Sequence, residues 1–276
     1  MAADIRRLVA SLALVALTGC NAILGPSRPD TNWHVYERGH FVFHVRPGSF
    51  AEQQVDNLGP LLEDQFVVSR SRLGLTYDGR IAMYLYNSGS DAGLADDLGN
   101  GDHSGVAFPE TEAVKAACVS PLNGNLFALL AHEANHVITH KGLGRPGTTL
   151  LNEGLASAIV SESHYAVGPS FYYAWTAAHR SQIPPIANLA DDNKWRDYQS
   201  QVAYSAGASF LAYLIETEGA ARLRQIYYAN SSSFAAKFQE VYGRSLATAH
   251  ADWLAFCDQR AAPPTVDFAS LRTKRE

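Results

Sequence analysis

The segment LLAHEANHVITH, residues 129–140, constrains the fold more than any other part of this chain. It contains His132, Glu133 and His136 in the order H-E-x-x-H. Residues four positions apart are close neighbours only on an α-helix, so the two histidines can bind one metal ion only if the segment is helical. Glu133 would then lie beside them, where a carboxylate can take a proton from water. The segment therefore predicts a helix that carries two metal ligands.

A catalytic metal site needs a third protein ligand and one open position, which two histidines alone do not provide. Glu153, 17 positions after His136 in the segment LLNEGLA, is the candidate. The intervening GLGRPGT can form a turn, and Thr148 or Thr149 can cap a second helix behind it. A helix, a reversing loop and another helix would bring the two segments side by side. The pattern therefore predicts a metal site made of His132, His136 and Glu153.

Each of these residues also has an interpretation without a metal. His132 and His136 would then be core histidines of a buried helix. Glu153 would be an acid near a helix start, where it interacts favourably with the helix dipole. His140 lies one turn beyond His136, about 6 Å farther along the helix axis, so we expect it to lie outside the ligand set.

The N-terminus has the order of parts of an export signal. Arg6 and Arg7 precede an apolar run at residues 8–17, which is too short to span a bilayer. The segment LTGC then ends at Cys20 and resembles the lipobox of bacterial lipoproteins, which are cut before the cysteine and carry lipid on it. The resemblance implies that Cys20 is the membrane anchor, and Asn21 after it implies the outer membrane.

We therefore expect a signal peptide at residues 1–19, a tether at 20–31, one domain at 32–260 and a tail at 261–276. The mature protein would lie in the bacterial cell envelope, at the periplasmic face of the outer membrane, where acyl chains alone hold it. The alternatives are an ordinary secreted protein that is cut at another small residue, or a buried N-terminal helix.

Strand patterns occur in the first half of the domain and helical patterns in the second. The segment NWHVYERGHFVFHV predicts two short strands, RIAMYLYN a third, and SGVAFPETEAVKAACVS two extended segments. Ser49 would cap a long helix among them, with Glu52 completing a capping box, and Pro60 would kink or split that helix. This order indicates an α+β fold, with a small N-terminal mixed sheet and its helices followed by a mainly helical C-terminal half.

Charge and composition narrow the choice of partners. The net charge is −5 and no basic stripe appears outside the short tail RTKRE, so nothing favours nucleic acid. With 47% hydrophobic residues, the chain can bury one substantial core. Two cysteines remain besides Cys20. In an oxidising compartment, Cys118 and Cys257 can pair or stay as two buried thiols.

The two motifs together resemble those of the gluzincin metallopeptidases, the clan of thermolysin and the aminopeptidase N-like enzymes. The resemblance covers roughly residues 35–257, but only the two short motifs are specific. Leu150 departs from the pattern because Trp is common there, and the spacing to the ligand glutamate is slightly shorter than in the aminopeptidases. No G-x-M-E-N segment precedes the motif, which disfavours an aminopeptidase. The matching residues are His132, Glu133, His136 and Glu153, with Asn152, Gly154, Leu155 and Ala156 around the last of them.

The resemblance implies a zincin-like fold, a bound zinc ion and hydrolysis of a peptide or protein substrate. Zinc would polarise the scissile carbonyl and activate water, with Glu133 as general base and later as proton donor to the leaving amine. The anionic intermediate needs a further donor, for which Tyr204 is the first candidate and Tyr198 and His164 are weaker ones. The segment GVAF at residues 105–108 resembles the edge strand on which such enzymes bind an extended peptide.

Two other functions fit the same residues. One is a non-catalytic lipoprotein that keeps the zincin fold as a binding or assembly module, and the other is a zinc hydrolase of non-peptide amides, since the water-activating chemistry is the same. The sequence leaves open the cleavage specificity, the choice between endo and exo action, and the oligomeric state.

Overall fold

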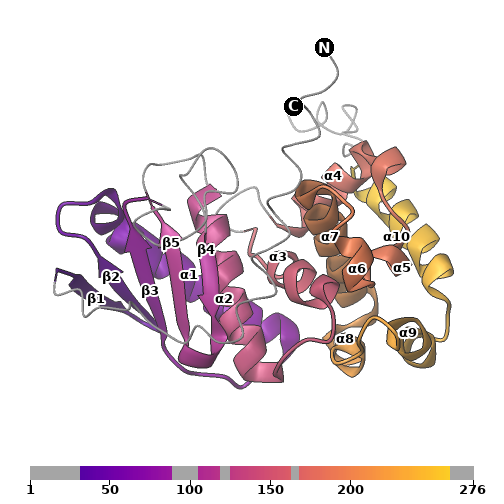
Figure 1. Cartoon of the computed structure of the whole chain (residues 1–276), viewed down its shortest axis with the longest axis horizontal. Coiled ribbons are helices and arrows are strands. Elements are labelled where there is room, and N and C mark those ends of the chain that lie inside the picture. Colours follow the sequence, from indigo (N-terminus) through magenta and orange to yellow (C-terminus); the bar gives the residue numbers. More distant parts are fainter. Residues whose placement is uncertain (1–31, 89–104, 119–124, 163–167, 262–276) are drawn as a thin grey trace, which may run out of the picture.

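The computed structural model describes residues 32–88, 105–118, 125–162 and 168–261 of the chain. It has the expected α+β architecture, with a sheet in the N-terminal half and helices in the C-terminal half (Figure 1). The expected signal peptide, Cys20, the tether, His164 and nearly all of the tail lie outside the described residues. None of the helices within the described residues is long and apolar enough to cross a membrane.

The sheet is mixed, as its sequence predicted. Its strand order is β1-β2-β3-β5-β4, in which β2, β3 and β5 run parallel and the two outer strands pair antiparallel with their neighbours. Because β4 pairs with β5 on one side, it forms an edge of the sheet within the described residues. The strands are β1 (His34–Arg38), β2 (Phe41–Val45), β3 (Ile81–Tyr86), β4 (Gly105–Phe108) and β5 (Ala113–Ala117).

One face of the sheet is covered by α1 (Phe50–Leu73) and α2 (Asn125–Leu143). Alternate residues of β2 and β3, such as Phe43 and Met83, are fully buried, while the residues between them are mostly half-buried. This period of two residues is what places one face of a strand in the core. The helices α1 and α2 also pack against each other. The metal-motif helix α2 therefore contacts both the sheet and α1.

Helix α1 begins as expected but does not break at its proline. The hydroxyl of Ser49 accepts a hydrogen bond from the Glu52 N–H at 3.1 Å, whereas the Glu52 carboxylate accepts from Gly48 N–H and does not return to Ser49. Pro60 lies inside one continuous helix, so of the kink or split that the sequence predicted, the split does not occur. Pro60 and Asp56 are both exposed, so water can satisfy the carbonyl whose partner N–H the proline lacks.

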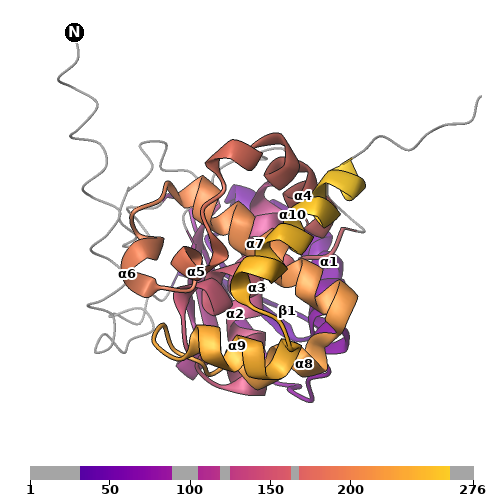
Figure 2. The same ribbon diagram turned by 90° about the vertical axis from the view of Figure 1, so that its right-hand side faces the viewer.

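The second half of the chain is helical, as expected. Its elements wrap around α7, which carries a nearly continuous row of buried residues. Figure 2 shows α10 lying across the outside of this half, over α4 and α7. The elements are η4 (Leu150–Gly154, a π-helical turn), α3 (Leu155–Ala158), α4 (Pro169–Ala178), α5 (Ile186–Leu189), α6 (Asp192–Trp195), α7 (Ser200–Glu218), α8 (Ala220–Ile226), α9 (Phe234–Tyr242) and α10 (Leu246–Ala261).

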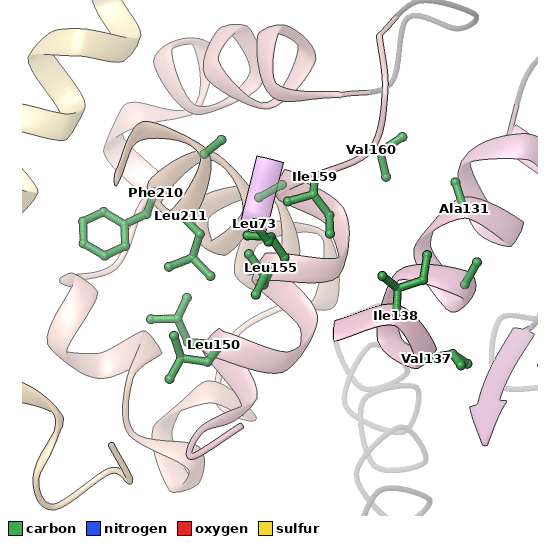
Figure 3. Packing of buried hydrophobic residues seen from close by; sticks show 14 of the residues in the cluster. Leu73, Ala131, Val137, Ile138, Leu150, Leu155, Ile159, Val160, Phe210 and Leu211 are labelled. Atoms are coloured by element: carbon green, nitrogen blue, oxygen red, sulfur yellow. The ribbon is translucent and has the colours of Figure 1, made fainter. Parts of the chain in front are cut away.

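One hydrophobic core joins the two halves. Figure 3 shows Leu150, Leu155 and Leu211 directed toward one another, so that the segment after the first motif packs against α7. Burial of such side chains contributes about 1.5–3 kcal/mol each to folding. The core therefore holds the two motif segments and α7 in one rigid arrangement.

The two described cysteines do not form a disulfide. Cys118 follows β5 and Cys257 lies on α10, and both are buried free thiols. Burial raises the pKa of each thiol to about 12. Of the two alternatives that the sequence left open, the pair of buried thiols is the one observed.

Candidate metal centre

The three expected ligands meet at one point between α2 and η4. Their donor atoms form a small triangle, with 3.0 Å between His132 Nε2 and His136 Nε2. Glu153 Oε2 lies 3.3 Å from each of these nitrogens. Among the described residues, this is the one cluster of His, Cys, Asp and Glu side chains whose donor atoms are close enough to hold a metal ion.

The triangle fits a zinc ion. A tetrahedral zinc with bonds of about 2.0–2.1 Å separates neighbouring ligand atoms by about 3.3–3.4 Å. The observed separations of 3.0 to 3.3 Å are close to that value. Two imidazoles and one carboxylate are also a ligand set that zinc accepts, and they leave one coordination position open. The residues therefore match the ion in both chemistry and spacing.

The charges at the centre favour a cation. Burial opposes the ionisation of Glu153, but His136 and His132 overcome it and hold the pKa of this carboxyl well below its usual range. Burial likewise lowers the pKa of His136, but the Glu153 carboxylate outweighs it and raises this pKa to about 9. The buried carboxylate therefore requires a positive charge next to it, which a proton or a metal ion can supply.

Glu153 reaches the histidines through a tightly held loop. Gly147 N–H donates to the carbonyl of Tyr227 at 2.9 Å, and a Cβ on Gly147 would lie 2.3 Å from the Ala229 carbonyl oxygen. Behind the loop, the Thr148 hydroxyl accepts from Leu151 N–H at 3.3 Å, which confirms one of the two expected caps. The loop between α2 and η4 is thus held against the C-terminal half of the chain, at Tyr227 and Ala229.

The glycine that follows Glu153 has a packing role. A Cβ on Gly154 would lie 3.0 Å from the carbonyl carbon of Gly207 on α7, so the two glycines allow the helices to approach closely. The turn that contains Glu153 is π-helical, a conformation that occurs often at functional sites. No pattern in the sequence indicated this π-helical turn.

Ser157 is a site residue that the sequence analysis missed. Its hydroxyl lies 3.0 Å from His132 Nδ1, so it orients the ring with Nε2 toward the other ligands. Such contacts to the second ring nitrogen are usual around metal-binding histidines. Ser157 comes four residues after Glu153, and this one-turn spacing was a signal that was available in the sequence.

Glu133 lies beside the ligands, against the edge strand. It is only 7% exposed, and a Cβ on Gly105 of β4 would come within 2.9 Å of its Cγ. Burial raises the pKa of Glu133, and the charges of His132 and His136 offset this in part. A buried carboxyl group with a raised pKa is suited to accept a proton and to release it again.

Tyr204 also lies at the centre, in the second turn of α7. Its ring centroid is 6.1 Å from that of His132 and 5.8 Å from that of Trp195. Burial and the nearby Glu153 carboxylate raise the pKa of the Tyr204 hydroxyl, which therefore remains a hydrogen-bond donor. α7 begins at Ser200, four residues before Tyr204.

Tyr198, a weaker candidate for the oxyanion donor, and His140 both have partners outside the ligand triangle. The Tyr198 hydroxyl accepts a hydrogen bond from Asn188 at 2.8 Å, and none of its described contacts is with a ligand residue. His140 pairs with Glu110 at 3.0 Å, so it stays outside the ligand set as expected.

No protein-family model and no curated protein sequence matches this chain. The functional assignment therefore rests on the geometry and chemistry of the centre.

Proposed function

We propose that this protein is a zinc-dependent metallopeptidase of the gluzincin type, anchored in the bacterial cell envelope by lipid on Cys20. One observation carries the proposal. The donor atoms of His132, His136 and Glu153 are spaced for zinc, and Glu133 lies beside them in a buried position. A lost ligand or a replaced glutamate would have favoured a non-catalytic binding module, and this chain has both the three ligands and Glu133.

Each residue of the centre has a separate task in this proposal. When bound, zinc supplies Lewis-acid polarisation of the scissile carbonyl and lowers the pKa of water. His132, His136 and Glu153 bind the ion. A carboxylate oxygen of Glu133 takes a proton from the attacking water and passes it to the nitrogen of the leaving amine. The Tyr204 hydroxyl donates a hydrogen bond to the oxyanion that develops on the substrate.

The neighbouring edge strand supports a peptide as the substrate. Within the described residues, no strand pairs with the outer side of β4, and apart from the Ala107 N–H, which donates to the Glu133 carboxylate, its outward backbone groups can pair with an extended chain. Because Gly105 of β4 contacts Glu133, a peptide paired with this strand would pass beside the general base. This arrangement favours a peptide over a small non-peptide amide.

The proposal is tested with purified residues 21–276, by metal analysis and by an unbiased peptide cleavage screen with and without a chelator. We expect about one zinc ion per chain, and cleavage that the chelator stops and added zinc restores. If the protein contains zinc but cleaves no peptide in the screen, the binding module replaces the peptidase. If it contains no zinc and cleaves nothing, the metal centre itself is wrong.

The variant Tyr204→Phe should lower the cleavage rate and keep the zinc. Removing one oxyanion donor costs about 10²- to 10³-fold in kcat in well-studied hydrolases, which sets the upper limit here because zinc shares the task. The measurement is kcat and KM together with zinc content. Tyr198→Phe is the matched control and should behave like wild type. An unchanged kcat in Tyr204→Phe would remove Tyr204 from the mechanism.

A further inference from the structure

Three fully buried polar side chains form a connected network behind the metal centre. Gln65 and Ser69 lie on α1, and Asn135 lies on α2 directly before His136. Ser69 Oγ donates to Asn135 Oδ1 at 2.6 Å, and Gln65 Nε2 donates to the same oxygen at 3.1 Å. Gln65 Nε2 also lies 2.7 Å from Ser69 Oγ, so one of its two N–H groups is shared between Ser69 Oγ and Asn135 Oδ1. The network therefore joins α1 to the metal-motif helix.

The same network reaches the chain that follows Glu153. Asn135 Nδ2 donates to the Ala156 carbonyl at 2.7 Å, three residues after this ligand. Farther along, Gln65 Nε2 donates to the Ile159 carbonyl at 3.0 Å, and Gln65 Oε1 accepts from Ser161 N–H at 2.7 Å. Two polar side chains thus hold both segments that carry metal ligands.

The orientation of the Asn135 amide is fixed by its partners. Its oxygen accepts from two donors on α1, so its nitrogen must face the Ala156 carbonyl. Directional bonds of this kind define a distance, whereas apolar contacts tolerate small shifts. A buried network in which every member is satisfied can therefore set the spacing of the segments that it joins.

We propose that Asn135 is a positioning residue for the metal centre, and that Gln65 and Ser69 hold it in place. It sets the separation between α2 and the segment after Glu153, and so keeps the third ligand at the distance that zinc requires. Its own side chain does not bind the ion, because its three hydrogen bonds all go to Gln65, Ser69 and Ala156. This inference rests on the proposed metal centre.

The test uses Asn135→Ala and measures metal binding, independently of any substrate. We expect zinc affinity, measured by competition with a chromophoric chelator, to fall about 10- to 100-fold, the usual effect of removing a supporting contact around a metal ligand. The absorption spectrum of the cobalt(II)-loaded protein should also change, since it reports the coordination geometry. A residue that only stabilised the fold would leave that spectrum unchanged.

Ser69→Ala and a matched control test the same role with milder substitutions, in case Asn135→Ala does not fold. Ser69→Ala removes one hydroxyl from the network, and zinc affinity should fall about twofold to tenfold, the range for one buried hydrogen bond. Ser209→Ala is the matched control, because Ser209 is also fully buried and its hydroxyl bonds Thr176 at 2.8 Å and Trp253 Nε1 at 3.0 Å. Both variants should lose thermal stability, but only Ser69→Ala should lose zinc affinity.

Each outcome decides one question. If Asn135→Ala and Ser69→Ala bind zinc as wild type does, with an unchanged cobalt spectrum, the positioning role is wrong and the metal centre stands. If Ser209→Ala weakens zinc binding as much as Ser69→Ala, the effect is a general loss of stability and the inference is also overturned. A wild type that binds neither ion contradicts the metal centre, and the positioning role with it.

Discussion

Glu133→Gln should lower the rate of peptide hydrolysis by about 10²- to 10⁴-fold, because the amide can neither take nor return a proton. We expect a loss near the upper end, since one carboxylate serves both proton transfers. The substitution is nearly isosteric and Glu133 is not a ligand, so zinc content and thermal stability should stay close to those of wild type. The measurements are kcat on a peptide that wild type cleaves, zinc per chain, and the unfolding temperature.

The control for this variant is Glu110→Gln. Glu110 is an exposed acid outside the ligand triangle, and it pairs with His140, which lies on α2 like Glu133. Glu110→Gln should therefore leave the rate of hydrolysis unchanged. Full activity in Glu133→Gln would show that the water-activating role belongs to another group. Loss of both zinc and activity would instead mean that Glu133 supports the ligands themselves.

Glu153→Ala should abolish tight zinc binding and the stabilisation that zinc gives. A ligand that binds only the folded state stabilises it by about 4 kcal/mol when its free concentration is 1,000 times its Kd. Wild type should therefore unfold at a higher temperature when zinc is added, whereas Glu153→Ala should not. The measurements are zinc per chain after dialysis and thermal unfolding with and without zinc.

His140→Ala is the control for the loss of a ligand. It removes a histidine from α2, the helix of His132 and His136, but leaves the three residues of the ligand triangle in place. This variant should keep its zinc and the rise in unfolding temperature. If Glu153→Ala binds zinc with the wild-type affinity, the third ligand is a different residue.

Local patterns in the sequence were sufficient for much of the fold. The alternation around Phe41 and Phe43 predicted buried strand faces, because side chains of a strand alternate between two sides. The four-residue spacing of His132 and His136 predicted their shared helix face for a similar reason. In both cases neighbouring positions in the chain determine the geometry.

Other features depend on residues far apart in the chain, and no local pattern shows them. Asn135 meets Ser69 across 66 positions, and Gln65 meets Ser161 across 96. Pro60 was expected to kink or split its helix, and the split does not occur for a related reason: the exposure of the surrounding turn decides whether the proline is tolerated, and packing sets that exposure. The two motifs predicted which side chains meet at the candidate centre, but not the network behind them.

The contact between Gly147 and Tyr227 has a consequence for synthesis of the chain. The loop between the two ligand segments is fixed by a residue 80 positions farther along, on the turn after α8. A nascent chain that ends before this turn contains all three ligands but has no partner for the Gly147 N–H. If the proposed centre binds zinc, we therefore expect full affinity only once the C-terminal helices are present, and a chain interrupted before them should release the ion more readily than the finished protein.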